Sequence, residues 1–208
     1  MSLTLPVSIG EALDKLSILD IKMDLIKDSR RELVKVEYDL LSNQLLPFIE
    51  KQPQLYKLLK NINLVIWHEM DVLRDGELTD REYSKLCRKT VTDNDIRFRI
   101  KNKINLACQS VLKEQKGYKK TQIVLNLLEN TDFQTHCFII QYYSVRYDET
   151  LVQTLNSTIQ SKFEYDFSIV FLKEYPTAIK SIIIPNRPIG DILDSLGIQF
   201  QELEIYKF

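Results

Sequence analysis

The side chains best suited to binding an anion lie between residues 90 and 105, the most cationic stretch of the chain. Four polar residues of this stretch share one arc of a helix at about 100° per residue, namely Asn94, Arg97, Lys101 and Asn105. An arginine beside an apolar stripe is well suited to a bidentate contact with a carboxylate or a phosphate. The alternative is an internal ion pair with an acidic side chain on another helix, and the pattern leaves both interpretations open.

Two other predicted helices carry polar residues at matching spacing. One face of the helix expected over residues 9–27 carries Glu11, Lys15 and Lys22. One face of the helix expected over residues 53–75 carries Asn63, Trp67, Asp71 and Arg74. We expect these residues and the arc over 94–105 to form one polar cluster between helices. The cluster holds five cations and two acids. Buried cations are costly without an anion, so this surplus predicts a phosphate-bearing ligand.

Four long helices are predicted to position this cluster. Their expected ranges are 9–27, 30–50, 53–75 and 80–115, the last with an alternative start near residue 92. Ser8, Ser29 and Thr79 are candidate N-caps, because each precedes a glutamate by three residues. Short connections between amphipathic helices predict an antiparallel helical bundle over residues 1–120. Trp67 is expected in its core and His68 on its surface.

The pattern changes after residue 120. A short connecting helix is expected over 121–129, followed by a strand, a helix, two strands, a helix and a strand over 137–144, 148–163, 167–173, 178–185, 188–197 and 198–208. A turn at residues 174–177 is expected to join the two central strands as a hairpin. This βαββαβ order is that of the ferredoxin-like fold. The predicted class is therefore α+β, with a helical domain over 1–120 and a small ferredoxin-like domain over 121–208.

The composition excludes several classes of protein. The chain has 208 residues and a net charge of −1, yet residues 85–120 carry 11 basic and 3 acidic side chains. Such a segment either pairs with acids of the same chain or faces an anion. The three cysteines are odd in number and widely spaced, which favours reduced thiols and a cytoplasmic location. No apolar run is long enough to span a bilayer, and no signal peptide is expected.

No catalytic motif or cofactor motif is present. The chain lacks the glycine-rich signatures of P-loops and dinucleotide-binding sites, so we expect no cofactor. His68 and His136 are the only histidines, which removes most schemes for a metal site or a catalytic triad. We therefore predict no metal site and assign no catalytic residue.

Three motifs in the helical half resemble a known family. They comprise Gly10-Glu11, Asp14-Lys15, Ile18 and Ile21-Lys22, then Asn63, Trp67, Asp71 and Arg74, then Asn94-Asp95, Arg97, Lys101, Ile104-Asn105, Glu114, Lys116 and Tyr118. With these motifs in order, residues 5–120 resemble an uncharacterised family of unknown function from bacteria and large DNA viruses. Its members are often met near surface-glycan and glycosyltransferase genes, which implies a glycan-related context. The resemblance implies no particular reaction and does not cover residues 121–208.

Four hypotheses follow, in order of preference. The first is a non-enzymatic helical module that binds an anionic, phosphate-bearing small molecule, such as a nucleotide or a nucleotide sugar. The second is a structural or oligomerisation protein with an internal ion-pair network, which would make the chain a homo-oligomer. The third is an enzyme of phosphosugar or glycan metabolism with Glu11 or Asp71 as acid or base. The fourth, a nucleic-acid binder, is disfavoured because the basic segment has few interleaved aromatic residues.

Overall fold

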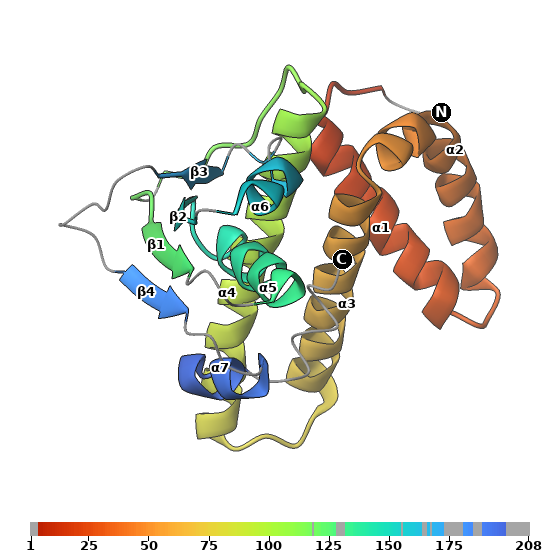
Figure 1. Cartoon of the computed structure of the whole chain (residues 1–208). Helices are drawn as coiled ribbons and strands as arrows, with labels where there is room; N and C mark the ends of the chain where they lie inside the picture. Colours follow the sequence, from red (N-terminus) through yellow and green to blue (C-terminus); the bar gives the residue numbers. More distant parts are fainter. Residues whose placement is uncertain are drawn as a thin grey trace. The chain divides into compact units, whose positions relative to one another are not determined.

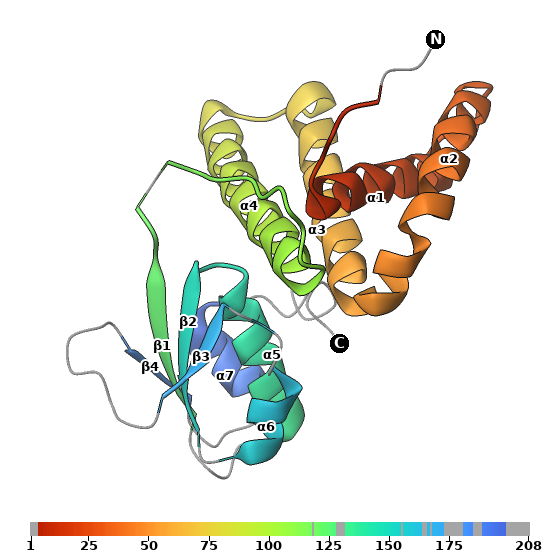
Figure 2. The same cartoon turned by 90° about the horizontal axis from the view of Figure 1, so that it is seen from above.

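The chain folds into two compact units, Met1–Gln115 and Lys116–Phe208 (Figures 1 and 2). The structure is a computed structural model, and it describes residues 4–117, 119–127, 132–154, 156–163, 166, 168–172, 181–184 and 189–198. Tyr118, the last residue of the family motifs, lies outside these ranges. Helices combine with one small sheet, as an α+β class implies. Among the described helices, none has both the length and the apolar character needed to cross a membrane.

The first unit contains four helices with largely predictable ends. They are α1 (Ile9–Leu25), α2 (Arg30–Lys51), α3 (Pro53–Asp75) and α4 (Asp80–Ala107). The Ser8 hydroxyl accepts the Glu11 N–H at the start of α1, and Thr79 forms a complete capping box with Glu82 at the start of α4. The candidate cap Ser29 makes no side-chain bond, and Asp28 accepts the first N–H of α2 instead.

Three helices share the core of this unit. The large buried side chains come from α1, α3 and α4 and include Leu13, Leu16, Leu59, Ile62, Ile96 and Ile100. Helix α2 packs chiefly on α1, and Leu45 is its one buried residue (Figure 1). Helix α4 is one continuous helix, which decides between the two sequence alternatives, but it ends at Ala107. The antiparallel arrangement of all four helices stays a prediction.

The second unit is built on a parallel sheet. Its elements are β1 (Gln122–Leu127), α5 (Phe133–Ser144), β2 (Glu149–Gln153), α6 (Ser157–Lys162), β3 (Ile169–Phe171), β4 (Ser181–Ile184) and α7 (Ile189–Leu196). The strand order is β3-β2-β1-β4, and each neighbouring pair is parallel. Leu125 of β1 lies opposite Val152 of β2 on one side and Ile182 of β4 on the other.

The ferredoxin-like prediction is wrong for the described strands. Strands β3 and β4 are separated by β2 and β1, so they form no hairpin, and the pairing is parallel throughout. The predicted helix over 121–129 is the strand β1, the predicted strand over 137–144 is part of the helix α5, and residues 148–163 hold both β2 and α6. Helix α7 confirms the predicted helix over 188–197. The turn at 174–177 and the last predicted strand, beyond residue 198, lie outside the described residues.

Burial on all sides explains why the sequence pattern predicted a helix at β1 and a strand at α5. Each residue of α5 from Thr135 to Ser144 is buried, so the helix lacks a polar face. Strand β1 has three consecutive buried residues, Ile123, Val124 and Leu125, so it lacks the alternation of a half-exposed strand. Periodicity does not separate a buried helix from a buried parallel strand, because both are continuous apolar runs.

Candidate functional site

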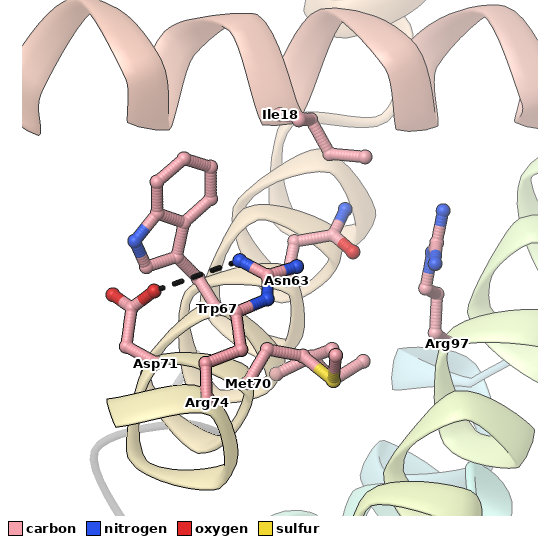
Figure 3. Close-up of a pocket in the computed structure, with 8 residues that line it drawn as sticks. Ile18, Asn63, Trp67, Met70, Asp71, Arg74 and Arg97 are labelled. Atoms are coloured by element: carbon pink, nitrogen blue, oxygen red, sulfur yellow. Dashed lines mark ion pairs between the residues drawn. The ribbon is translucent and has the colours of Figure 1, made fainter. Parts of the chain in front are cut away.

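A pocket of about 170 Å³ lies in the first unit, between α1, α3 and α4 (Figure 3). Its lining comprises Ile18 of α1, Asn63, Ile66, Trp67, Met70, Asp71 and Arg74 of α3, and Arg97 of α4. Ile18, Ile66 and Met70 make part of the wall apolar, while the two arginines and the aspartate supply charge. Five of the candidate residues predicted from sequence therefore meet at one pocket, namely Asn63, Trp67, Asp71, Arg74 and Arg97.

The Arg97 guanidinium is held by a buried carboxylate. Its Nε donates to Asp14 Oδ1 at 2.9 Å, and its Nη2 donates to Asp14 Oδ2. Asp14 is 1% exposed, whereas the Arg97 side chain is 25% exposed and borders the pocket. The hydrogen bonds that Arg97 donates to Asp14 raise the pKa of Arg97, and they outweigh the effect of burial. Arg97 is therefore fixed in orientation and remains charged.

Asn63 completes the support of this pair. Its Nδ2 donates to Asp14 Oδ1 at 2.9 Å and to Ser17 Oγ at 2.8 Å. Ser17 in turn donates to the backbone oxygen of Asp14 at 2.8 Å. In Figure 3 the Asn63 amide nitrogen points toward α1, and its oxygen points away from that helix. The carbonyl oxygen of Asn63 is thus a hydrogen-bond acceptor beside the pocket.

The outer rim of the pocket carries the indole and one loose ion pair. Trp67 is half-buried, in contrast to the expected core position, and its ring stands beside the pocket (Figure 3). Arg74 Nη1 lies 4.0 Å from Asp71 Oδ1, and both side chains are more than half exposed. A pair this long and exposed contributes little to stability, so the Arg74 side chain is available to a ligand.

A second polar cluster surrounds the start of α1. Lys101 Nζ donates to Glu11 Oε2 at 2.7 Å and lies 3.0 Å from Glu114 Oε2. Burial lowers the pKa of Lys101, but the bonds with both glutamates outweigh this effect and raise it. Asn105 Oδ1 accepts the Gly10 N–H at 2.7 Å, and Ser110 Oγ accepts the Ile9 N–H. Because side chains already occupy the first N–H groups of α1, this helix start is not open to an anion.

The remaining candidates lie elsewhere. Lys15 forms an exposed ion pair with Glu37 of α2. Lys22 is half-buried and has no ion-pair partner among the residues that the structure describes. Asn94 supports Arg97, because its Oδ1 accepts a 3.4 Å bond from Arg97 Nη1 while its Nδ2 donates to the Thr90 carbonyl.

The predicted surplus of cations is wrong, because it omitted three acids that the fold brings in. Asp14 neutralises Arg97, Glu114 forms an ion pair with Lys101, and Glu37 forms one with Lys15. Asp14 was recognisable in the sequence as an aspartate between apolar residues on the inner face of the first helix. An acid in such a position needs a buried partner. Its partner on α4 is decided by packing.

Sequence reasoning also missed a third cluster, between α3 and α4. Lys89 Nζ donates to Glu69 Oε1 and, at 2.7 Å, to Asp93 Oδ2. Both carboxylates are more than nine-tenths buried, and Glu69 Oε2 has no hydrogen-bond partner among the described residues. Burial raises the pKa of Glu69, Lys89 opposes this shift, and Asp93 adds to it. Two buried acids thus share one ammonium group.

Among the described residues, no group of three or more histidine, cysteine, aspartate or glutamate side chains is placed to hold a metal ion. The three cysteines are free thiols.

Comparison with known families agrees with the three motifs found in the sequence. Residues 3–132 match a family described as a family of unknown function (DUF6165). The chain belongs to the DUF6165 family. The match covers strand β1 and all four helices of the first unit. The pocket and the three polar clusters therefore lie within the part that defines DUF6165. Comparisons with curated proteins and with solved structures give no match.

Proposed function

We propose that the helical unit is a non-enzymatic binding module for a small molecule that carries an anionic group next to a ring. The observation that carries this proposal is the position of Arg97, which is clamped by Asp14 and borders a pocket with Trp67 on its wall. The support comes from this geometry and not from a surplus of positive charge.

Some N–H groups of the Arg97 guanidinium are available to a ligand. A guanidinium has five N–H groups, and within the part of the chain that the structure describes those of Arg97 make two bonds to Asp14 and one long bond to Asn94. The remaining N–H groups and the exposed guanidinium of Arg74 are donors for a phosphate or a carboxylate. Preorganisation by Asp14 favours binding, because Arg97 loses little side-chain freedom when a ligand arrives.

The size of the pocket restricts which part of a ligand it holds. A cavity of about 150 Å³ accommodates a benzene ring, so a pocket of about 170 Å³ suits one ring. Trp67 offers an apolar face for that ring, and Asn63 and Asp71 offer acceptors for its hydroxyl or amino groups. A nucleotide or a nucleotide sugar would place one ring inside and the remainder outside. The family resemblance adds a glycan-related context to this proposal, and the widely spaced cysteines add a cytoplasmic location.

The second candidate function is structural. Asp14 neutralises Arg97, and Glu11 with Glu114 neutralises Lys101, so these networks are complete without a ligand. In that case the clusters would serve to specify the packing of α1 against α4.

The experiment is a thermal-shift screen of nucleotides, nucleotide sugars and sugar phosphates at low and high salt, followed by calorimetric titration of any hit. Arg97→Ala is a poor probe, because it leaves the buried Asp14 carboxylate unpaired. Arg74→Ala and Trp67→Leu are better, since Arg74 is exposed and Trp67 is half-buried. We expect each to weaken binding about tenfold or more and to leave the fold intact.

Arg88→Ala is the matched control, because Arg88 is an exposed arginine of α4 that does not line the pocket. Equal losses for Arg74→Ala and Arg88→Ala would mean nonspecific attraction to the basic surface. A screen without any salt-tolerant hit would overturn the binding proposal and favour the structural function.

A further inference from the structure

Helix α2 has a second apolar face that the described residues of the helical unit leave largely exposed. Leu33, Val36 and Leu40 recur at i, i+3 and i+7, and their exposed fractions are 77%, 64% and 62%. The opposite face, which includes the buried Leu45, packs on α1. Most helices of a folded domain have a polar outer face, so this stripe is unusual. Figure 1 shows α2 at the outside of the helical unit, alongside α1.

Carboxylates border the stripe on both sides. Glu32 and Asp39 are exposed, and their spacing of seven residues places them along one edge. Glu37 lies along the other edge, where its pair with Lys15 is exposed and therefore weak. Arg30, the nearest cation of α2, is already paired with Asp28.

We infer that the stripe Leu33–Val36–Leu40 is a docking surface for a basic amphipathic helix of a partner protein. Apolar anchors of such a helix, at i, i+3 and i+7, would pack on the three side chains. Lysines and arginines on its flanks would face Glu32, Asp39 and Glu37. This surface is distinct from the pocket, and the inference does not depend on the proposed ligand.

The same charges disfavour a second copy of the chain as the occupant. A two-fold interface brings each patch against itself. Pairing α2 with its own copy would place acidic edges near acidic edges, and like charges across a contact are unfavourable.

The test uses the full chain and two designed helical peptides with the same leucine spacing. One peptide has lysine and arginine on both flanks of the leucines, and the other has glutamate there. Fluorescence anisotropy should show binding of the basic peptide, a weakening of that binding by salt, and no binding of the acidic peptide. Leu33→Glu and Leu40→Glu should each weaken binding about tenfold or more.

Val111→Glu is the matched control, because Val111 is 96% exposed and lies outside α2. Glu32→Lys with Asp39→Lys should reverse the preference between the two peptides. Equal affinity for both peptides, or no binding of either, would overturn the inference. Two further results would also overturn the inference, because they would show that something other than a partner helix covers the stripe. One is a dimer by light scattering that Leu40→Glu converts to a monomer. The other is a lower Tm for Leu40→Glu in the isolated chain.

Discussion

The guanidinium of Arg97 and the carboxylate of Asp14 form a two-point hydrogen-bonded pair that joins α4 to α1. The carboxylate is almost completely buried, and Asn63 from α3 donates to one of its oxygens. One buried acid therefore collects donors from the two other core helices of the unit. The pair both orients the pocket arginine and ties the three helices together.

Removal of one partner of this pair should destabilise the protein strongly. Arg97→Ala leaves a buried carboxylate whose remaining side-chain donor, among the described residues, is Asn63. We expect a loss of about 3–5 kcal/mol in the free energy of unfolding. Urea denaturation measures this loss. The double variant Asp14→Leu/Arg97→Met should recover most of it, because an apolar pair carries no unpaired charge. A single variant within about 1 kcal/mol of the parent chain would contradict the structural role of the pair.

Glu69 should make stability depend on pH. Burial raises its pKa above the ordinary value of 4.5, so the folded chain binds this proton more tightly than the unfolded chain. The free energy of unfolding should therefore rise as the pH falls from above the raised pKa toward 4.5. Glu69→Gln removes this contribution, so its advantage over the parent chain should be largest at neutral pH and shrink on acidification. Parallel stability curves for the two chains between pH 4 and pH 8 would show the prediction to be wrong.

Gly10 should not tolerate a side chain. A Cβ at this position would overlap the carbonyl oxygen of Lys101 in the backbone of α4 and crowd Asn105 Oδ1. We expect Gly10→Ala to destabilise by about 1–3 kcal/mol, although alanine has the higher helix propensity. Gly190→Ala in α7 is the control, because a Cβ there meets no atom within 4 Å. Thermal unfolding of both variants tests the contact, and equal Tm values would exclude it.

The helix caps allow a matched comparison. Thr79 makes a complete capping box at α4, whereas Ser29 makes no side-chain cap bond at α2. Thr79→Ala should therefore cost about 0.5–2 kcal/mol, and Ser29→Ala should cost much less. Chemical denaturation of the two variants measures the difference. A larger loss for Ser29→Ala would mean that the Ser29 side chain does cap the start of α2.

The helical half was largely predictable because its signals are local. Pro53 at the start of α3, Gly76 after its end and Thr79 before α4 lie where the sequence placed the boundaries. Capping and helical periodicity connect residues within about four positions of each other, so they can be read along the chain. In the second half, β3, β4 and α7 lie within the two strands and the helix predicted over 167–173, 178–185 and 188–197. The assignments of α5 and β1 were wrong, because both are buried on all sides and lose the period that distinguishes a helix from a strand.

The sequence by itself determined four long helices, the starts of all four and the end of α3. It also placed Asn63, Trp67, Asp71 and Arg74 on one face of α3. Only the tertiary structure decided that Arg97 meets Asp14 and that Lys89 joins Glu69 to Asp93. It also decided that the strands pair in parallel. Arg97 and Asp14 are 83 positions apart and Lys89 and Glu69 are 20 apart, whereas Lys89 and Asp93 are local neighbours. Helix spacing places each charge on a face, but the packing of that face against another helix selects its partner.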